Sequence, residues 1–81
     1  MANYDALEAF LARRGGEELE LGFADLERII GGELPLGALR PQWWTNENGP
    51  GVPQMHCRSW RNPGYDAYLL NGERVMFRRR R

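Results

Sequence analysis

The chain has 81 residues, and its eleven arginines and eleven acidic residues give a formal net charge of zero without a single lysine. A chain of this length forms one domain that buries only about 60% of its unfolded surface, and we expect that domain over residues 1–79 with a basic tail at 80–81. One cysteine excludes an internal disulfide, and no apolar run approaches the roughly 20 residues that cross a bilayer, so we expect a cytoplasmic protein without a membrane-spanning segment.

A helix is predicted near the N-terminus, and Gly15-Gly16 ends it. Asp5 followed by Glu8 is typical of a capping box, and Asn3 is an alternative N-cap. The apolar residues recur at helical spacing and form one stripe. They are Tyr4, Leu7, Phe10 and Leu11.

A half-buried strand is predicted over Glu18–Phe23, where apolar and polar residues alternate strictly. Helical spacing returns over 24–30, and Gly31-Gly32 closes this second helix. Both elements present their apolar side chains to the core. The inward positions are Leu19, Leu21, Phe23, Leu26, Ile29 and Ile30.

The segment from Leu34 to Pro53 is rich in proline and glycine, so we expect irregular structure with at most one short helical turn over 36–39. Loops of this length are usually packed by their own side chains or functional. Pro53 suits the first position of a helix, which we place over 53–62. Pro63-Gly64 ends that third helix.

A hairpin is predicted over 65–70 and 73–79, around Asn71-Gly72. A two-residue loop would leave neither face apolar, whereas a three-residue loop over 70–72 gathers the apolar residues on one face. The inner face would hold Tyr65, Ala67, Leu69, Val75 and Phe77. The outer face would hold Asp66, Tyr68, Arg74, Met76 and Arg78.

The predicted order is α-β-α, an irregular loop, and α-β-β. It is the order of a small winged-helix-like α+β domain with a three-stranded antiparallel sheet. In such domains the third helix enters the major groove of DNA and the hairpin lies along the backbone. About twenty residues separate the second and third helices, far more than in a tight helix-turn-helix. We therefore expect the domain to resemble winged-helix domains in the order of its elements only.

Charge is sorted along the chain. Residues 1–33 hold three arginines and eight acidic residues (3 − 8 = −5), and residues 34–81 hold eight arginines and three acidic residues (8 − 3 = +5). A basic region attracts nucleic acid by neutralising phosphates, and arginine adds two-point contacts to phosphate or guanine. We therefore expect the C-terminal half to bind nucleic acid, through one continuous basic face.

Several short strings occur together in a recognisable order. They are Leu21–Gly31, Leu34-Pro35, Trp43–Asn46, Trp60 with Gly64-Tyr65, and Val75–Arg78. The set resembles a small uncharacterised family of bacterial and phage domains, over about Tyr4 to Arg79. The chain departs from that family's pattern at Gln54 and His56, where the pattern has His and Gln. The resemblance implies a prokaryotic or phage origin and suggests a role in nucleic-acid transactions.

The residues thus favour a non-enzymatic module that binds duplex DNA. Arginine on the third helix can pair with guanine, and glutamine or asparagine with adenine. The hairpin arginines would contact phosphates and carry no sequence information. The predicted nucleic-acid-binding residues are Gln54, Arg58, Arg61, Asn62, Arg74, Arg78, Arg79 and Arg80.

The alternative hypothesis is a small phage- or mobile-element-encoded inhibitor, like an anti-CRISPR protein, that binds a host defence protein complex. Trp43, Trp44 and Asn46 would then bind the partner, unless the tryptophans pack in the core. The sequence leaves a monomer and a homodimer both open.

Catalysis and metal binding find little support. His56 and Cys57 are adjacent on a predicted helix and diverge by about 100°, so they do not form a nucleophile–base pair. No second histidine or cysteine exists to complete a zinc site. The acidic residues between Glu17 and Glu27 are most simply a solvated face that protects a strand edge. We expect no metal and no cofactor.

Overall fold

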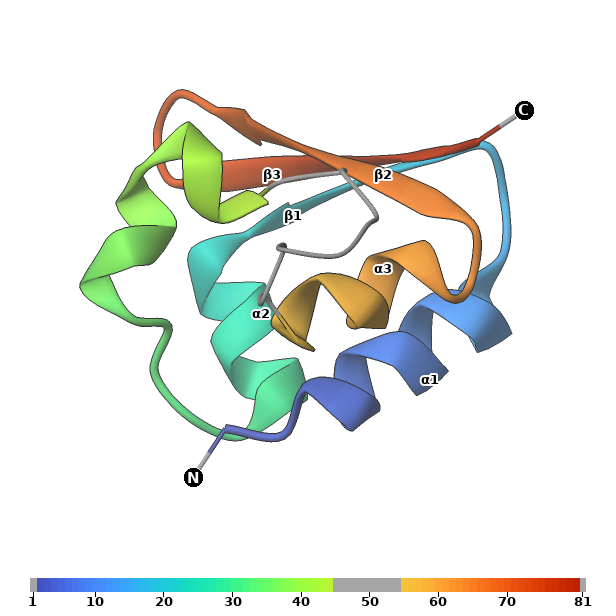
Figure 1. Ribbon diagram of the computed structural model, residues 1–81, viewed down its shortest axis with the longest axis horizontal. Coiled ribbons are helices and arrows are strands. Elements are labelled where there is room, and N and C mark those ends of the chain that lie inside the picture. The colour runs from blue at the N-terminus through green and yellow to red at the C-terminus, as the bar shows by residue number, and fades with distance from the viewer. Residues whose placement is uncertain (1, 45–54, 81) are drawn as a thin grey trace.

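A computed structural model describes residues 2–44 and 55–80 of the protein (Figure 1). Its helices and strands are α1 (Tyr4–Arg14), β1 (Glu18–Gly22), α2 (Phe23–Ile30), α3 (Arg58–Arg61), β2 (Tyr65–Leu70) and β3 (Arg74–Arg79). Short 3₁₀ turns span Leu36–Leu39, Pro41–Trp44 and Met55–Cys57. The fold is therefore α+β, with the predicted element order.

The three strands form one antiparallel sheet in the order β1-β3-β2. The last strand of the chain, β3, is thus the central strand of the sheet. It pairs with β1 on one side and with β2, its partner in the hairpin, on the other. The three helices lie on one side of the sheet, with α1 beside α3 (Figure 1). The other side of the sheet faces solvent and carries most of the charged strand residues, including Glu18, Glu20, Arg74 and Arg78.

Helix α1 begins with the alternative cap rather than the predicted capping box. The Asn3 Oδ1 accepts a hydrogen bond from the Asp5 N–H at 3.0 Å, which satisfies one of the otherwise unpaired amides of the first turn. Helix α2 begins at Phe23, so this residue belongs to the helix and not to the predicted strand. Gly31 ends α2 in the left-handed conformation, with φ 71°.

The third helix differs from its prediction over 53–62. Within the described residues it is a 3₁₀ turn over Met55–Cys57 followed by one α-helical turn, α3. Its inward side is formed by Cys57 and Trp60, which are buried. Pro53 and Gln54 lie outside the described residues.

The hairpin has the predicted loop length at a shifted position. Leu70 pairs with Arg74, so the three loop residues are 71–73 and not 70–72. Gly72 and Glu73 both have positive φ, of 78° and 55°, which lets the chain reverse one residue later than predicted. The shift moves the pairing by two positions, and it therefore preserves the predicted inner and outer faces.

The core lies between the sheet and the helices and is built on aromatic residues. Trp60 and Phe77 are fully buried, and their ring centroids lie 6.2 Å apart. Trp44 closes the core on one side, with its ring centroid 5.3 Å from that of Trp60. Its indole N–H donates to the Ala38 carbonyl at 2.8 Å, which ties the segment 36–44 to the domain.

Candidate nucleic-acid interface

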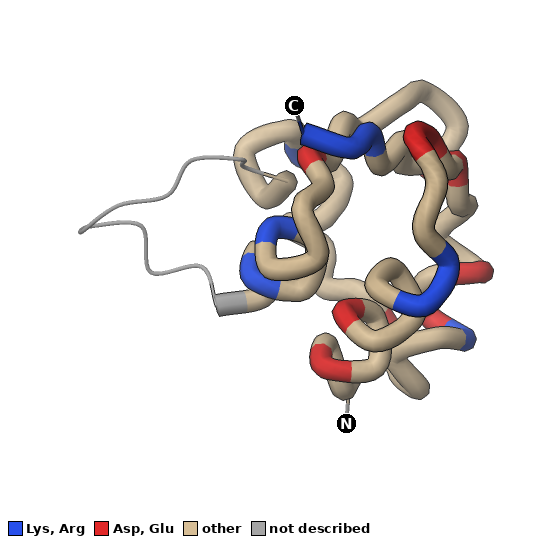
Figure 2. Tube along the Cα trace, turned by 90° about the vertical axis from the view of Figure 1, so that its right-hand side faces the viewer, with Lys and Arg blue, Asp and Glu red and all other residues tan. Residues whose placement is uncertain are grey.

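The sheet brings the acidic and basic halves of the sequence together. Because β1 pairs with β3, Glu18 lies opposite Arg78, and their side chains form an ion pair at 3.3 Å. Glu20 pairs in the same way with Arg74. Acidic and basic segments consequently alternate around the molecule (Figure 2). The expected separation into an acidic and a basic half, with one continuous basic face on the latter, is wrong.

Arg74 does not join the other predicted arginines. It lies at the start of β3, whereas Arg78 and Arg79 lie at the end of the strand. Its partner Glu20 neutralises it locally. The prediction that Arg74 belongs to the same site is therefore wrong, because the strand separates it from the rest.

A cluster forms around Asp66, on the edge strand β2. The Arg80 Nη2 donates to the Asp66 Oδ1 at 2.9 Å, and the Arg61 Nη1 lies 4.0 Å from the same oxygen. The Arg80 backbone N–H also donates to the Gly64 carbonyl at 2.8 Å. Arg80 is thus held to the domain and does not begin a free tail. The side chain of Arg61 is only 11% exposed, so this residue supports the cluster from beneath.

Arg79 links the end of β3 to the turn after α1. Its Nε donates to the Gly16 carbonyl at 3.1 Å, and its Nη2 donates to the Tyr65 hydroxyl at 3.2 Å. The guanidinium carbon lies 5.1 Å from the centre of the Tyr65 ring, within cation–π range. The Tyr65 hydroxyl donates to the same Gly16 carbonyl at 2.9 Å. These contacts bring the last turn of α1 toward the end of the sheet.

We call this part of the molecule the arginine-rich end. A hollow of about 540 Å³ between β1, β2 and β3 lies at its centre. The hollow is lined by Arg78, Arg79 and Arg80 with Glu17, Glu18 and Asp66. Arg61 lies beside Asp66, and we include Arg13 and Arg14 because they stand in the last turn of α1, just before Glu17, although they line a separate hollow with Phe10 and Ile29. The charges of this end sum to 6 − 3 = +3, whereas the other charged residues that the structure describes sum to 4 − 7 = −3. The molecule is therefore dipolar, although not along its sequence.

Arg13 and Arg14 are the members that sequence reasoning missed. They lie in the acidic half of the sequence, so the charge count assigned them to the wrong side. Both side chains are exposed, and neither makes an ion pair within residues 2–44 and 55–80. One feature of the sequence could have identified them. They lie in the last turn of a predicted helix, before two glycines that turn the chain toward the sheet.

The predicted base-contacting face of the third helix lies elsewhere. Arg58 and Asn62 line a groove of about 400 Å³ together with Asp5 and Glu8 of α1. The Asn62 Nδ2 donates to the Glu8 Oε1 at 3.3 Å. Arg58 is exposed and makes no ion pair with a described residue, but two carboxylates stand beside it. Gln54 lies outside the described residues.

The two tryptophans of the predicted partner surface face inward. Trp44 is 3% exposed, so it is a core residue and its assignment to a partner-binding surface is wrong. Trp43 is half-buried, and its ring stacks on His56 with centroids 3.7 Å apart. Asn46 lies outside the described residues.

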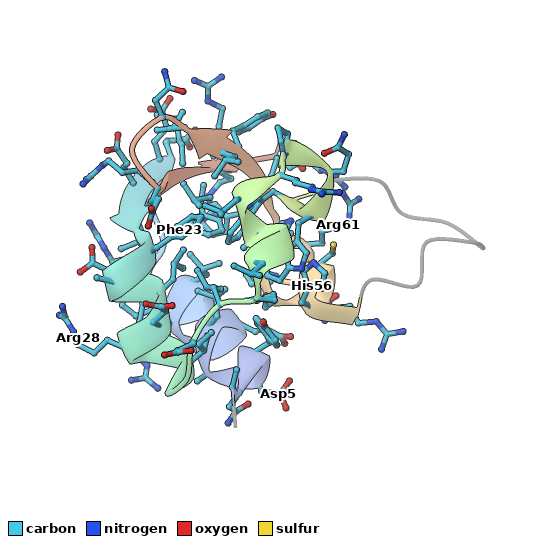
Figure 3. The ribbon with its side chains drawn as sticks, turned by 90° about the vertical axis from the view of Figure 1, so that its left-hand side faces the viewer. Asp5, Phe23, Arg28, His56 and Arg61 are labelled. Carbon is cyan, nitrogen blue, oxygen red and sulfur yellow. The ribbon has the colours of Figure 1, made fainter. Side chains whose placement is uncertain are left out.

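His56 has a structural environment. Its Nε2 donates to the Trp43 carbonyl at 2.8 Å, because a carbonyl oxygen only accepts. Burial lowers the pKa of the imidazole below its ordinary value, and this hydrogen bond opposes the shift. Figure 3 shows His56 within the molecule and Arg28 pointing away from it. His56 contacts three aromatic rings, those of Tyr4, Trp43 and Trp60, and this packing accounts for its position.

Among the residues that the structure describes, no group of three or more histidine, cysteine, aspartate or glutamate side chains is placed to hold a metal ion. None of the described helices has the length and apolar character to span a membrane.

Comparison with known proteins agrees with the resemblance at the level of the family. Neither the curated proteins nor the solved structures include a match to this chain. A family model matches residues 4–81, which is almost the whole chain. The protein therefore belongs to the family described as a domain of unknown function, DUF7662.

Proposed function

We propose that this domain is a non-enzymatic module that binds nucleic acid, with duplex DNA as the ligand and phosphate as the group recognised. The observation that carries the proposal is the charge of +3 gathered at the arginine-rich end of a protein whose net charge is zero. Each phosphate that an arginine neutralises releases counterions from the DNA, which is the main source of affinity in such contacts.

The ion pairs of this end leave its arginines accessible. The side chains of Arg78 and Glu18 are 57% and 52% exposed. Exposed pairs of this kind contribute at most about 1 kcal/mol, because water screens them. A phosphate can therefore replace a carboxylate as the partner of Arg78. Arg13 and Arg14 need not give up any described ion pair to bind.

Sequence preference would come from α3. Arg58 is exposed and can reach a base edge, but Asp5 and Glu8 beside it oppose a close approach of phosphate. The proposal is therefore of backbone binding with weak base discrimination.

The test is fluorescence polarisation of a labelled random duplex over a series of salt concentrations. We expect binding at low salt and a slope of log K against log salt that reports the number of phosphates contacted. The double variant Arg13→Ala/Arg14→Ala should weaken binding and reduce the slope by about 1.8, because each lost contact removes about 0.9.

Arg40→Ala is the matched control, since Arg40 is exposed and lies outside the arginine-rich end. It should bind as the unaltered protein does. Equal losses in Arg40→Ala and in the double variant would contradict the proposed site. Absence of any binding at low salt would contradict the proposed function.

The exposed leucines favour a second candidate function. Leu36 is 86% exposed and Leu39 is 54% exposed, which is unusual for large apolar side chains grouped together. They suit a small inhibitor that binds a protein of a host defence complex. Such an inhibitor should ignore free DNA and co-purify with that complex, and Leu36→Ser should release it.

A further inference from the structure

A second hollow adjoins the arginine-rich end, on the helical side of the molecule. It has a volume of about 540 Å³, and both α1 and α2, which pack against each other, contribute to its lining. That volume lies within the range of sites that bind small organic groups. We call it the helix hollow and define it by its lining residues, which are Ala6, Ala9, Phe10, Arg13, Arg14 and Ile29.

The spacing of the α1 residues explains why they meet in one hollow. Residues three, four, seven and eight positions apart lie on one face of an α-helix, and the α1 residues of the hollow occupy positions 6, 9, 10, 13 and 14. Leu7 and Leu11, next to this face, are buried and hold α1 on the core. The hollow is therefore built on a helix that is fixed in place.

The floor of the hollow is apolar and incompletely covered. Phe10 and Ile29 pack against the core, yet both side chains are only half-buried. The two alanines add only methyl groups to the lining. An aromatic ring and aliphatic groups thus stay in partial contact with water, and a flat apolar group placed on them would remove that contact.

The rim of the hollow carries positive charge. Arg13 and Arg14 are exposed, and neither makes an ion pair with a described residue. No carboxylate is among the described residues that line the hollow. A second copy of this chain does not suit this surface, because a twofold contact would bring the arginines of both copies together. The surface suits a ligand that joins an anionic group to an apolar one.

The same two arginines connect the helix hollow to the arginine-rich end. They stand in the last turn of α1, and the Arg79 Nε donates to the carbonyl of Gly16, two residues after Arg14. A DNA strand whose phosphates lie along the arginine-rich end therefore reaches the rim of the hollow. In a nucleotide, one sugar joins the anionic phosphate to the flat base, which matches an arginine beside an aromatic floor.

Only an unpaired nucleotide can place its base in the hollow. In a duplex the bases are paired and stacked, so their faces are not free to contact a protein. The base of a single strand can stack on an aromatic ring or on an arginine guanidinium. Such a contact distinguishes single-stranded from paired DNA, whereas phosphate contacts alone position the ligand.

We infer that the helix hollow binds an unpaired base, so that the ligand of this domain is a DNA duplex with a single-stranded extension. Phe10 stacks on the base, and Arg13 and Arg14 bind the phosphates of the same strand. The inference rests on the proposed nucleic-acid binding and specifies the form of the DNA.

The experiment compares three labelled DNAs by fluorescence polarisation. The first is a blunt duplex, the second adds a single-stranded extension of thymidines, and the third adds an extension of equal length in which abasic sugars replace the thymidines. We expect the thymidine extension to bind about tenfold more tightly than the abasic one, because stacking of one base has an effect of this size. The ratio should be the same at every salt concentration, since both extensions carry the same number of phosphates.

Phe10→Leu tests the aromatic floor. Leucine keeps an apolar side chain against the core and removes the ring, so the preference for thymidine over abasic sugar should fall below about threefold. Its affinity for the blunt duplex should not change. Tyr68→Leu is the matched control, because it removes a ring that is 44% exposed on the solvent-facing side of the sheet, and it should keep the full preference.

Ala9→Gln is a second variant that leaves the core untouched. Ala9 is exposed, and glutamine suits a helix, so the fold should be preserved. The longer, uncharged side chain occupies part of the hollow and should lower the preference for thymidine in the same way as Phe10→Leu. Circular dichroism checks that each variant is folded.

The outcomes separate this inference from the proposed function. Equal affinity for the thymidine and abasic extensions, with salt-dependent binding of the blunt duplex, overturns the inference alone. An unchanged preference in both Phe10→Leu and Ala9→Gln also overturns it. Absence of binding to all three DNAs overturns the proposed function and the inference with it. If instead a labelled peptide of glutamates and leucines binds the unaltered protein but not Phe10→Leu, the hollow belongs to a protein partner and the inference is wrong.

Discussion

The two ends of the sheet differ in how their charges are arranged. At the end where β3 begins, Arg74 has Glu20 as its partner, and one cation meets one anion. At the other end, Arg61 and Arg80 share Asp66, so two cations meet one anion. The difference teaches that local excess of charge, and not the number of arginines in a segment, distinguishes the surface for which we propose an anionic ligand.

The largest effect is expected from the core residue that ties the segment 36–44 to the domain. Trp44→Ala removes a buried indole and its hydrogen bond to Ala38, and it should cost about 3–5 kcal/mol of unfolding free energy. That is a large part of the total for a small domain. Urea denaturation measures the loss. Tyr68→Ala should change stability by less than about 0.5 kcal/mol, because its ring is partly in solvent.

A second pair of substitutions compares the two ends directly. Arg61→Ala should destabilise the fold by about 1–2 kcal/mol, because its side chain is mostly buried and packs along its length. Arg74→Ala should cost less than about 0.5 kcal/mol, because its side chain is 50% exposed. Thermal unfolding of both variants tests this order. Equal losses would mean that burial does not distinguish the two arginines.

A third comparison concerns the carboxylates that face the arginines. Glu18→Gln removes a negative charge at the arginine-rich end and frees Arg78, so it should tighten DNA binding by about threefold at low salt. Glu20→Gln makes the same chemical change at the other end of the strand and should leave affinity nearly constant. The reverse order would place the DNA on the wrong end of the sheet.

The smallest effect is a dependence of stability on pH through His56. Burial lowers its pKa in the folded state below the ordinary value of 6.5, so the unfolded chain binds the proton more readily. Its contribution to stability is therefore complete above about pH 6.5 and declines as the pH falls through the unfolded value toward the lower, folded one. Denaturation curves between about pH 7 and pH 5 should show a small loss.

His56→Phe separates this residue from the other titrating groups. Phenylalanine keeps an aromatic ring against Trp43 and carries no proton. The variant should therefore lose less stability over the same pH range than the unaltered protein. An identical pH profile would assign the loss to groups other than His56.

Much of the fold was predictable because it depends on neighbours in the sequence. Helical spacing over Leu7 and Leu11 placed α1, and alternation over Leu19 and Leu21 placed β1. The inner face of the hairpin was predicted correctly, since burial requires Val75 and Phe77 to point the same way. The loop position was missed because Glu73 adopts a positive φ, which a residue without glycine's freedom seldom does.

The candidate site was predicted only in part. Arg78, Arg79 and Arg80 were identified from their number and position at the end of the hairpin. Arg13 and Arg14 were missed, because the contact between Arg79 and Gly16 joins the two extremes of the chain. No local pattern encodes such a contact.

The sequence by itself determined the elements, their inward faces and the total charge of this protein, because periodicity and composition are local properties. Only the tertiary structure decided which charges neutralise one another. The pairing of β1 with β3 sets acidic and basic segments from opposite ends of the chain side by side. Electrostatic energy depends on distance in space, and the sheet, not the order of residues, fixes that distance.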